Sequence, residues 1–260
     1  MNIFDPTPAE LKARSIYEKR YGKWYPDAVF RAKFICQLIG KENPFRHILD
    51  AAGFFPTAYI FSNYYPDSEV VIYSLYESDV PAEFNSSINY RHGDVTDINF
   101  PENYFDMAYL GETIEHVYDI DRCFKEIKRV LKPGGYLAIT TPNLAAWYNR
   151  LLLLFGKCPH NYHPAPITYS RRDKENLEAG YGKGLQNVPL HHYHIRVFTL
   201  DRLRDYLELM GFVIIKSTIV NFTTEDRKYR HLRKILNYMI PQGAKEGIMV
   251  IAKNVKNHKS

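Results

Sequence analysis

The chain alternates short apolar runs with segments of helical periodicity from residue 46 onward. The segments at residues 46–53, 70–77, 88–97 and 107–110 are short, and each ends in a small-residue, acidic or polar turn, which predicts strands of a parallel sheet. Residues 119–131 repeat their apolar positions at helical spacing, and the segment at Pro133 to Gly135 ends that helix before a further strand at 136–143. We therefore expect an open, doubly wound α/β sheet with mostly parallel strands.

Helices should flank this sheet at both ends of the chain. Thr7, Pro8 and Glu10 form a capping signature for one helix, and a second should run from Pro26 to Gly40. We expect residues 1–45 to form a helical cover and residues 46–260 to form the main domain. Within that domain, residues 144–196 break the alternation and predict a lid-like insertion. A helix after Thr199 and two strands follow, with a basic amphipathic helix expected at 225–239 between the strands.

Composition narrows the class of protein. The chain has 260 residues, of which 45% are hydrophobic and 24% charged, as in an ordinary globular protein. No apolar run reaches the roughly 20 residues that cross a bilayer, although the run at 151–155 could rest on a membrane surface or cover a pocket. Three cysteines without a close pair favour a reduced, cytoplasmic setting. The net charge of +5 permits nucleic acid or anionic lipid as a partner without favouring either.

The candidate chemistry lies where the predicted strands end, because ligands of open α/β sheets bind outside the carboxyl ends of the strands. Asp50 to Pro56 form a turn at a helix N-terminus, whose free backbone N–H groups suit an anionic group. Glu77 follows roughly 20 residues later, where a carboxylate can accept hydrogen bonds from a ribose diol. Asp94 and Val95 end the third strand and could flank an adenine. These features predict a nucleoside-cofactor site, and the missing phosphate-loop lysine disfavours triphosphate hydrolysis.

The motifs ILDAAG, GDVTD, FDMAYLGETIEHV, KPGG and AITTPN occur in the order typical of one family. Together they resemble the class I S-adenosyl-L-methionine-dependent methyltransferases, with a Rossmann-like fold, over about residues 46–211. The resemblance implies S-adenosyl-L-methionine as cofactor. It also implies that Asp50, Ala51, Ala52 and Gly53 approach its methionine end, Glu77 its ribose, Asp94 and Val95 its adenine, and Gly111 and Glu112 the open face beside the methyl group.

The first of these loops departs from the family pattern. Ala52, Phe54 and Pro56 stand where glycines are usual, and bulky residues can obstruct the close backbone approach that glycine allows. Methyltransferases associated with bacterial and archaeal glycan gene clusters have a similar proline-containing turn. The segment TPNLAAWYNRLLLLFGKCP resembles those enzymes as well.

A second group of candidates consists of carboxylates and imidazoles near the predicted acceptor side. Glu112, Glu115 and His116 follow the fourth strand, and His194 returns after the insertion together with His191 and His192. Glu112, Glu115, His116 and His194 could bind a divalent metal, and the E-x-x-E-H spacing resembles that of metal-dependent RNA 2′-O-methyltransferases and of ubiquinone O-methyltransferases. In the absence of a metal, His116 or His194 could act as general base with Glu115 beside it.

From the sequence we therefore expect a methyltransferase that acts on a hydroxyl group of a small molecule or glycan. One alternative is RNA 2′-O-methylation with a divalent metal, motivated by E-x-x-E-H and by the basic segment at 225–239. The alternative from another class is a catalytically inactive binding protein with the same fold, motivated by Ala52, Phe54 and Pro56.

Overall fold

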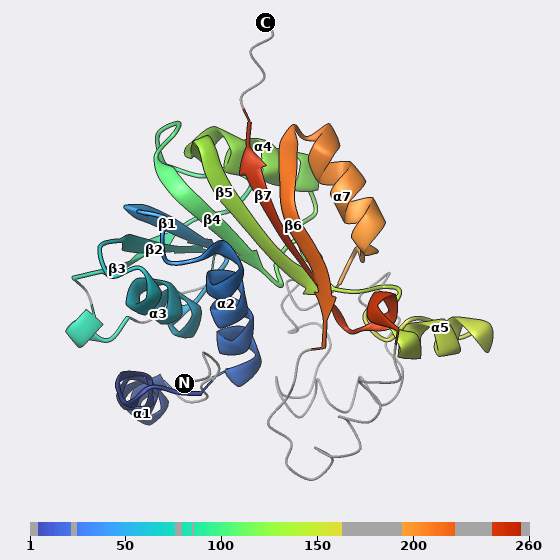
Figure 1. Ribbon diagram of the computed structural model, residues 1–260, viewed down its shortest axis with the longest axis horizontal. Helices are drawn as coiled ribbons and strands as arrows, with labels where there is room; N and C mark the ends of the chain where they lie inside the picture. The colour runs from blue at the N-terminus through green and yellow to red at the C-terminus, as the bar shows by residue number, and fades with distance from the viewer. Residues whose placement is uncertain are drawn as a thin grey trace, which may run out of the picture.

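The computed structural model describes residues 5–21, 25–75, 80–84, 86–162, 194–221 and 241–255. These residues form one sheet in the order β3-β2-β1-β4-β5-β7-β6 (Figure 1). The strands are β1 (His47–Ala51), β2 (Glu69–Ser74), β3 (Ile88–His92), β4 (Phe105–Gly111), β5 (Leu131–Pro142), β6 (Phe212–Val220) and β7 (Gly247–Asn254). The helices are α1 (Pro8–Tyr21), α2 (Pro26–Ile39), α3 (Phe55–Tyr64), α4 (Ile120–Val130), α5 (Trp147–Leu154) and α7 (Leu200–Leu209), with short 3₁₀ turns η1 (Ala82–Phe84) and η5 (Gln242–Ala244).

The topology of the sheet confirms the predicted fold class. Strands β1 to β5 pair in parallel, and β7 is inserted antiparallel between β5 and β6. The direction of strand order reverses at the boundary between β1 and β4. The carboxyl ends of these two central strands are therefore the expected place for a ligand.

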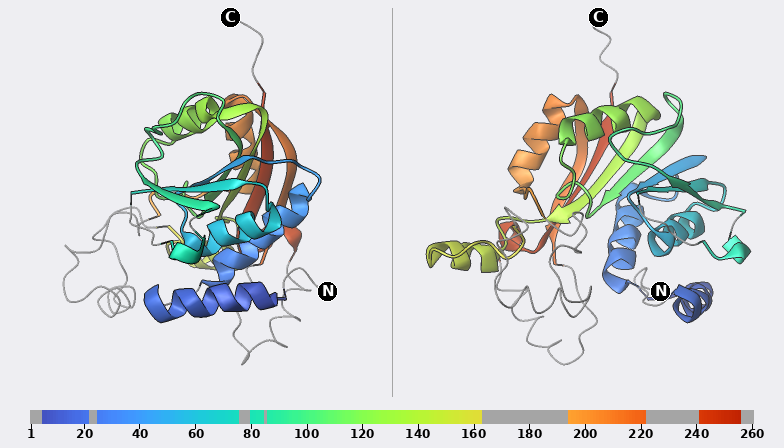
Figure 2. Two further views of the ribbon diagram at one scale, coloured as in Figure 1. Left: turned by 90° about the vertical axis from the view of Figure 1, so that its left-hand side faces the viewer. Right: turned by 180° about the vertical axis from the view of Figure 1, so that it is seen from behind.

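Two layers of helices cover the sheet, with α2 and α3 on one face and α4 and α7 on the other (Figures 1 and 2). Successive strand residues alternate between these layers: Ile48 packs with α2 and α3, whereas Leu49 packs with α4 and α7. Both faces are thus apolar. This burial explains why the central strands have nearly continuous hydrophobic sequences.

Helices α1 and α2 form as their capping signals predict. The hydroxyl of Thr7 accepts a hydrogen bond from the backbone N–H of Glu10 at 3.1 Å. The carboxylate of Glu10 also forms a buried ion pair with Lys33, with 2.6 Å between Oε2 and Nζ. Helix α2 contacts α3, β4 and β7, so it belongs to the helical layer on the sheet. The division of the chain at residue 45 stays a prediction.

Two boundaries differ from the sequence expectation. The third strand ends at His92 and not near Asp97, because Gly93 packs closely against the hydroxyl of Tyr73 and the chain turns there. The KPGG segment is a bulge inside β5, where Leu131 pairs with Phe105 and the register then shifts so that Tyr136 pairs with Met107. Both differences arise from contacts between strands, which periodicity along one segment does not report.

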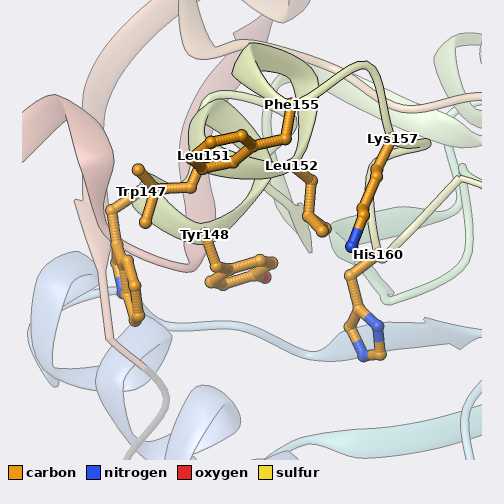
Figure 3. Close-up of a pocket in the computed structure, with 7 residues that line it drawn as sticks. All are labelled: Trp147, Tyr148, Leu151, Leu152, Phe155, Lys157 and His160. Carbon is orange, nitrogen blue, oxygen red and sulfur yellow. The ribbon is translucent and has the colours of Figure 1, made fainter.

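Part of the predicted insertion is described, namely residues 144–162 and 194–196. It contains α5, which extends away from the sheet (Figure 1). A cavity of about 450 Å³ lies along this helix and is lined by Trp147, Tyr148, Leu151, Leu152, Phe155, Lys157 and His160 (Figure 3). The basic segment expected at 225–239 lies outside the described residues. Within the described part of the chain, every helix is too short or too polar to cross a bilayer.

Candidate functional site

The first candidate loop follows β1 and is built around the buried carboxylate of Asp50. The hydroxyl of Thr57, in the first turn of α3, donates a hydrogen bond to Oδ2 of Asp50 at 2.5 Å. Gly53 lies over the same carboxylate, and a Cβ atom at this position would be 2.0 Å from Cγ of Asp50. The loop therefore requires glycine at residue 53, the one glycine that the sequence retains here.

The substitutions that distinguish this loop from the family pattern are accommodated locally. Ala52 adopts a left-handed conformation with φ of 58°, so the backbone keeps a shape that glycine normally provides. The ring of Phe54 packs edge-on against Tyr25 at a centroid distance of 5.2 Å. Pro56 is buried in the first turn of α3. The bulky residues are thus used in packing between the loop and the helices beside it.

The strain at Ala52 leads to a stability prediction. A left-handed conformation costs a non-glycine residue about 1–2 kcal/mol, and glycine at residue 52 would remove this strain from the folded state. Glycine also makes the unfolded chain more flexible, which lowers the stability gain by about 0.4–1 kcal/mol. Ala52→Gly should therefore raise the free energy of unfolding by about 0.5–1 kcal/mol in denaturant titrations. Ala51→Gly, in the buried end of β1, is the matched control and should destabilise by about 1 kcal/mol. Equal destabilisation by both substitutions would contradict the prediction.

Burial sets the charge state of Asp50. It raises the pKa of this carboxyl group to about 7, against the opposing hydrogen bonds from Thr57 and from the backbone of Phe54. The second oxygen, Oδ1, is buried and has no hydrogen-bond partner. An unsatisfied buried oxygen of this kind is suited to a cationic or hydrogen-donating group of a ligand.

Among the described residues, the others predicted to bind the cofactor lie at the end of β4 and after β3. Gly111 ends β4 beside β1, where Ala51 pairs with Leu110, and a Cβ atom on Gly111 would collide with the ring of Tyr109. Asp94 turns back and accepts hydrogen bonds from the N–H and the hydroxyl of Thr96, both at 2.8 Å. Val95 is buried in the core. Glu77 lies outside the described residues.

The second candidate loop follows β4 and begins with Glu112. This residue also has a left-handed backbone, with φ of 53°, and its N–H donates to the carbonyl of Thr140. Its carboxylate faces Arg31 of α2, with 3.9 Å between Oε1 and Nε. Burial raises the pKa of Glu112, while Arg31 and the hydroxyl of Thr140 oppose the rise. The sequence analysis missed Arg31, whose only signal is a cationic residue in the largely apolar segment 28–39.

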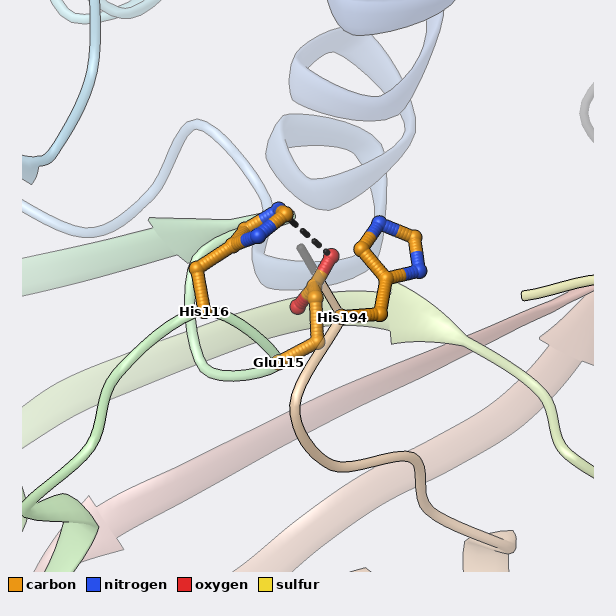
Figure 4. A group of neighbouring side chains, drawn as sticks. All are labelled: Glu115, His116 and His194. Atoms are coloured by element: carbon orange, nitrogen blue, oxygen red, sulfur yellow. Dashed lines mark ion pairs between the residues drawn. The ribbon is translucent and has the colours of Figure 1, made fainter. Parts of the chain in front are cut away.

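Glu115, His116 and His194 form one cluster in which the ligand atoms all lie within 4.8 Å of one another (Figure 4). Glu115 is fully buried, and its Oε2 accepts a hydrogen bond from the hydroxyl of Thr141 at 3.0 Å. Its Oε1 is 3.8 Å from Nε2 of His116. The ring of His116 packs edge-on against the ring of His194, with 4.7 Å between the ring centroids. Three of the four predicted metal ligands are therefore together, whereas Glu112, in the same loop, pairs with Arg31 of α2.

The electrostatics of this cluster depend on burial. Burial raises the pKa of Glu115 well above its usual range, and the neighbouring carboxylate of Glu112 adds to the rise. Burial also lowers the pKa of His194, against a hydrogen bond with the carbonyl of Asn161. His194 is thus favoured in its neutral form near pH 7, the form that accepts a proton or binds a metal.

Tertiary contacts bring His194 to the loop after β4, 78 residues earlier in the chain. The backbone N–H groups of Ile195 and Arg196 donate to the carbonyl of Glu115 at 3.0 and 3.3 Å. The guanidinium of Arg196 donates to the carbonyls of Val117 and Tyr118. The segment that follows the insertion is therefore fastened directly to the loop carrying the candidate residues.

A chain of buried amides supports His194 from the other side. Nδ1 of His194 is 3.0 Å from the carbonyl oxygen of Asn161. Asn149 of α5 donates to Oδ1 of Asn161 at 2.7 Å and accepts from the N–H of His160 at 2.9 Å. It also donates to the carbonyl of Asn143. The sequence analysis missed these amides, because asparagines in a loop give no signal of burial. His191 and His192 lie outside the described residues.

Comparison with known proteins finds matches to the central part of the chain. Residues 67–139 match a protein family described as a methyltransferase domain. The chain is 42% identical over 52 residues to a 2-phytyl-1,4-naphthoquinone methyltransferase of Synechococcus elongatus, covering 20% of this chain and 22% of that protein. It is 34% identical over 76 residues to a demethylmenaquinone methyltransferase of Listeria welshimeri, covering 25% of this chain and 32% of that protein. The matches thus span about a fifth to a third of these relatives.

The fold comparison covers much more of the chain. An S-adenosylmethionine-dependent methyltransferase from Mesorhizobium loti superposes with a TM-score of 0.54 at 15% identity, over 86% of this chain and 97% of that one. At this identity the likeness concerns the fold. Residues 67–139 therefore match a methyltransferase domain, and the chain has the fold of the class I S-adenosyl-L-methionine-dependent methyltransferases.

Proposed function

We propose that this protein transfers a methyl group from S-adenosyl-L-methionine to a hydroxyl group of a small molecule or glycan. The observation that carries the proposal is the cluster of buried Glu115 with the partly exposed His116 and His194, which lies in the loop after β4 and the segment docked on it. A carboxylate with two imidazoles can hold and move the proton of an alcohol. The cluster thus supplies the group that O-methylation needs.

The residues around the first loop fit the cofactor. The unpartnered Oδ1 of Asp50 suits the ammonium group at the methionine end of the cofactor. When bound, the cofactor supplies an electrophilic methyl group on a sulfonium leaving group. The protein then has to hold the acceptor in line and exclude water.

In the proposed reaction the cluster removes the acceptor proton. Neutral His116 or His194 accepts it, and the carboxylate of Glu115 stabilises the imidazolium that results. The same nitrogen and oxygen donors would suit a divalent metal, which would lower the pKa of a bound hydroxyl group. Activity that persists unchanged after chelation would exclude the metal version, whereas loss on chelation and rescue by an added divalent ion would support it.

A second candidate acceptor is the hydroxyl-bearing ring of a reduced quinone, because both curated relatives are named for quinone substrates. Removing a proton from a ring hydroxyl activates the ring carbon beside it as well as the oxygen. The product decides between these acceptors, since NMR distinguishes an O-methyl from a C-methyl group. RNA 2′-O-methylation stays an alternative that predicts salt-sensitive binding of oligonucleotides.

Calorimetric titration tests the proposal at its first step. S-Adenosyl-L-methionine and S-adenosylhomocysteine should both bind, and a panel of phenols, sugars and quinols should then reveal methyl transfer. Failure of both nucleosides to bind at millimolar concentration would contradict the enzymatic proposal. That outcome would favour the catalytically inactive binding protein.

A further inference from the structure

Among the described residues, five of the exposed large apolar side chains lie on helix α5 and at its C-terminal end. The exposed fractions are 54% for Leu153, 76% for Leu154 and 74% for Phe155, and Trp147 and Leu151 are exposed as well. The helix extends from the body of the protein, and its side chains line the cavity described above (Figures 1 and 3). Contiguous apolar surface of this kind on a soluble domain marks an interaction site.

The helix is anchored by a polar residue, which reverses the usual arrangement of an amphipathic helix. Asn149 is the buried residue of α5, and its side-chain amide bonds to the carbonyls of Asn143 and Leu144 and to Asn161. These hydrogen bonds hold the helix on the protein body through its polar side. The leucines are therefore held outward and contribute little to the core.

The helix and the loop after it carry only cationic charges, while Glu246 faces Tyr148 from outside this segment. Residues 144–162 include Arg150, Lys157 and His160 and contain neither aspartate nor glutamate. Arg150 binds the carbonyls of Ala145 and Gly243 but stays exposed, and Lys157 lines the same cavity as the leucines. Leucine and phenylalanine beside tryptophan, tyrosine and cationic groups are the composition of a helix that lies in the interface of an anionic bilayer.

We propose that α5, together with Phe155 and Lys157, docks the protein on the surface of a bilayer that contains anionic phospholipid. Leu153, Leu154 and Phe155 insert among the acyl chains, and Lys157 contacts the phosphate groups. Helix α5 follows β5 after the short connection 143–146, and Thr140 and Thr141 near the end of β5 contact Glu112 and Glu115. Docking therefore turns this edge of the sheet toward the membrane.

Vesicle sedimentation with the full chain tests the proposal. The wild-type protein should pellet with vesicles of phosphatidylcholine and phosphatidylglycerol more strongly than with phosphatidylcholine alone, and added salt should weaken the binding. The combined change Leu153→Ser, Leu154→Ser and Phe155→Ser should reduce partitioning by about tenfold or more. Lys157→Glu should reduce only the preference for the anionic vesicles. Leu209→Ser is the matched control, because Leu209 is 85% exposed on α7, and it should bind as the wild type does.

Circular dichroism should show that each variant is folded before it is compared. Absence of wild-type binding to anionic vesicles, or equal binding by the triple variant, would overturn the proposal. Sedimentation velocity tests whether a second copy of the chain covers this surface instead. If the wild type is a dimer, does not bind vesicles and becomes a monomer with the same three substitutions, the surface belongs to a dimer interface. The assay needs neither cofactor nor acceptor, so its outcome is independent of the proposed methyl transfer.

Discussion

Replacing Glu115 with glutamine should lower the rate of methyl transfer by at least about 100-fold while leaving the affinity for S-adenosylhomocysteine within about twofold. Glutamine keeps the size of the side chain and can still accept a hydrogen bond from Thr141. It removes the negative charge that lies 3.8 Å from His116. The loss should therefore appear in kcat, with the cofactor loop around Asp50 unaffected.

The pH dependence gives this prediction a second readout. Because burial and the charge of Glu112 raise the pKa of Glu115, its carboxyl group is protonated at low pH and becomes charged as the pH rises. Wild-type activity should accordingly increase with pH along a limb that Glu115→Gln lacks. Thr141→Val, which removes the hydrogen bond and keeps the carboxylate, is the matched control and should have the smaller effect. Wild-type turnover by Glu115→Gln would remove the cluster from the mechanism.

Asp50→Asn should change how the stability of the protein depends on pH. The pKa of Asp50 is raised from 3.8 to about 7 in the folded protein. Its protonated form is therefore favoured by folding, and this contribution is fully present below about pH 4 and is lost as the pH rises through about 7. Relative to Asp50→Asn, the wild type should lose about 2–3 kcal/mol of unfolding free energy between pH 5 and pH 8.

Denaturant titrations of both proteins at several pH values measure this difference. Thr57→Val serves as a companion variant, since it removes the hydroxyl that donates to Asp50 and should extend the decline to higher pH. A pH profile that is the same for the wild type and Asp50→Asn would show that the carboxyl group titrates normally.

The same residue should couple cofactor binding to proton release. A cationic group of S-adenosyl-L-methionine beside Oδ1 would favour the carboxylate, so binding near pH 6 should release up to about one proton from the wild type. Calorimetry in buffers of different ionisation enthalpy measures this proton. Asp50→Asn should bind the cofactor more weakly and release none. Equal proton release by the two proteins would place the cationic group elsewhere.

The sequence by itself determined most of the local structure and the fold class. Thr7 and Glu10 mark the start of α1, Gly40 follows the end of α2, and the apolar spacing at 119–131 predicts α4. These signals can be recognised in the sequence because capping, turn formation and the burial of one helix face depend on residues that are close together along the chain. The order of strands and helices then leaves few topologies, which is why the parallel sheet could be predicted.

The sequence also predicted where the loops after β1 and β4 bring their candidate residues. A carboxylate after β1 and the E-x-x-E-H segment after β4 are adjacent along the chain to strands that the pattern identifies, so their position at the edge of the sheet follows from topology. The charge states of these residues do not follow in this way. The pKa values of Asp50 and Glu115 are set by burial, which depends on every element packed around them.

The tertiary structure decided which contacts bring distant residues together. Arg31, which was not predicted, reaches Glu112 because α2 packs beside β4. His194 was grouped with Glu115 from the sequence, but the hydrogen bonds of Ile195 and Arg196 that hold it beside the loop after β4 are visible only in the structure. The outward display of the leucines on α5 likewise depends on the buried amide of Asn149. Periodicity could predict that α5 is an apolar helix, but whether an apolar helix is covered is a property of its neighbours and not of its own sequence.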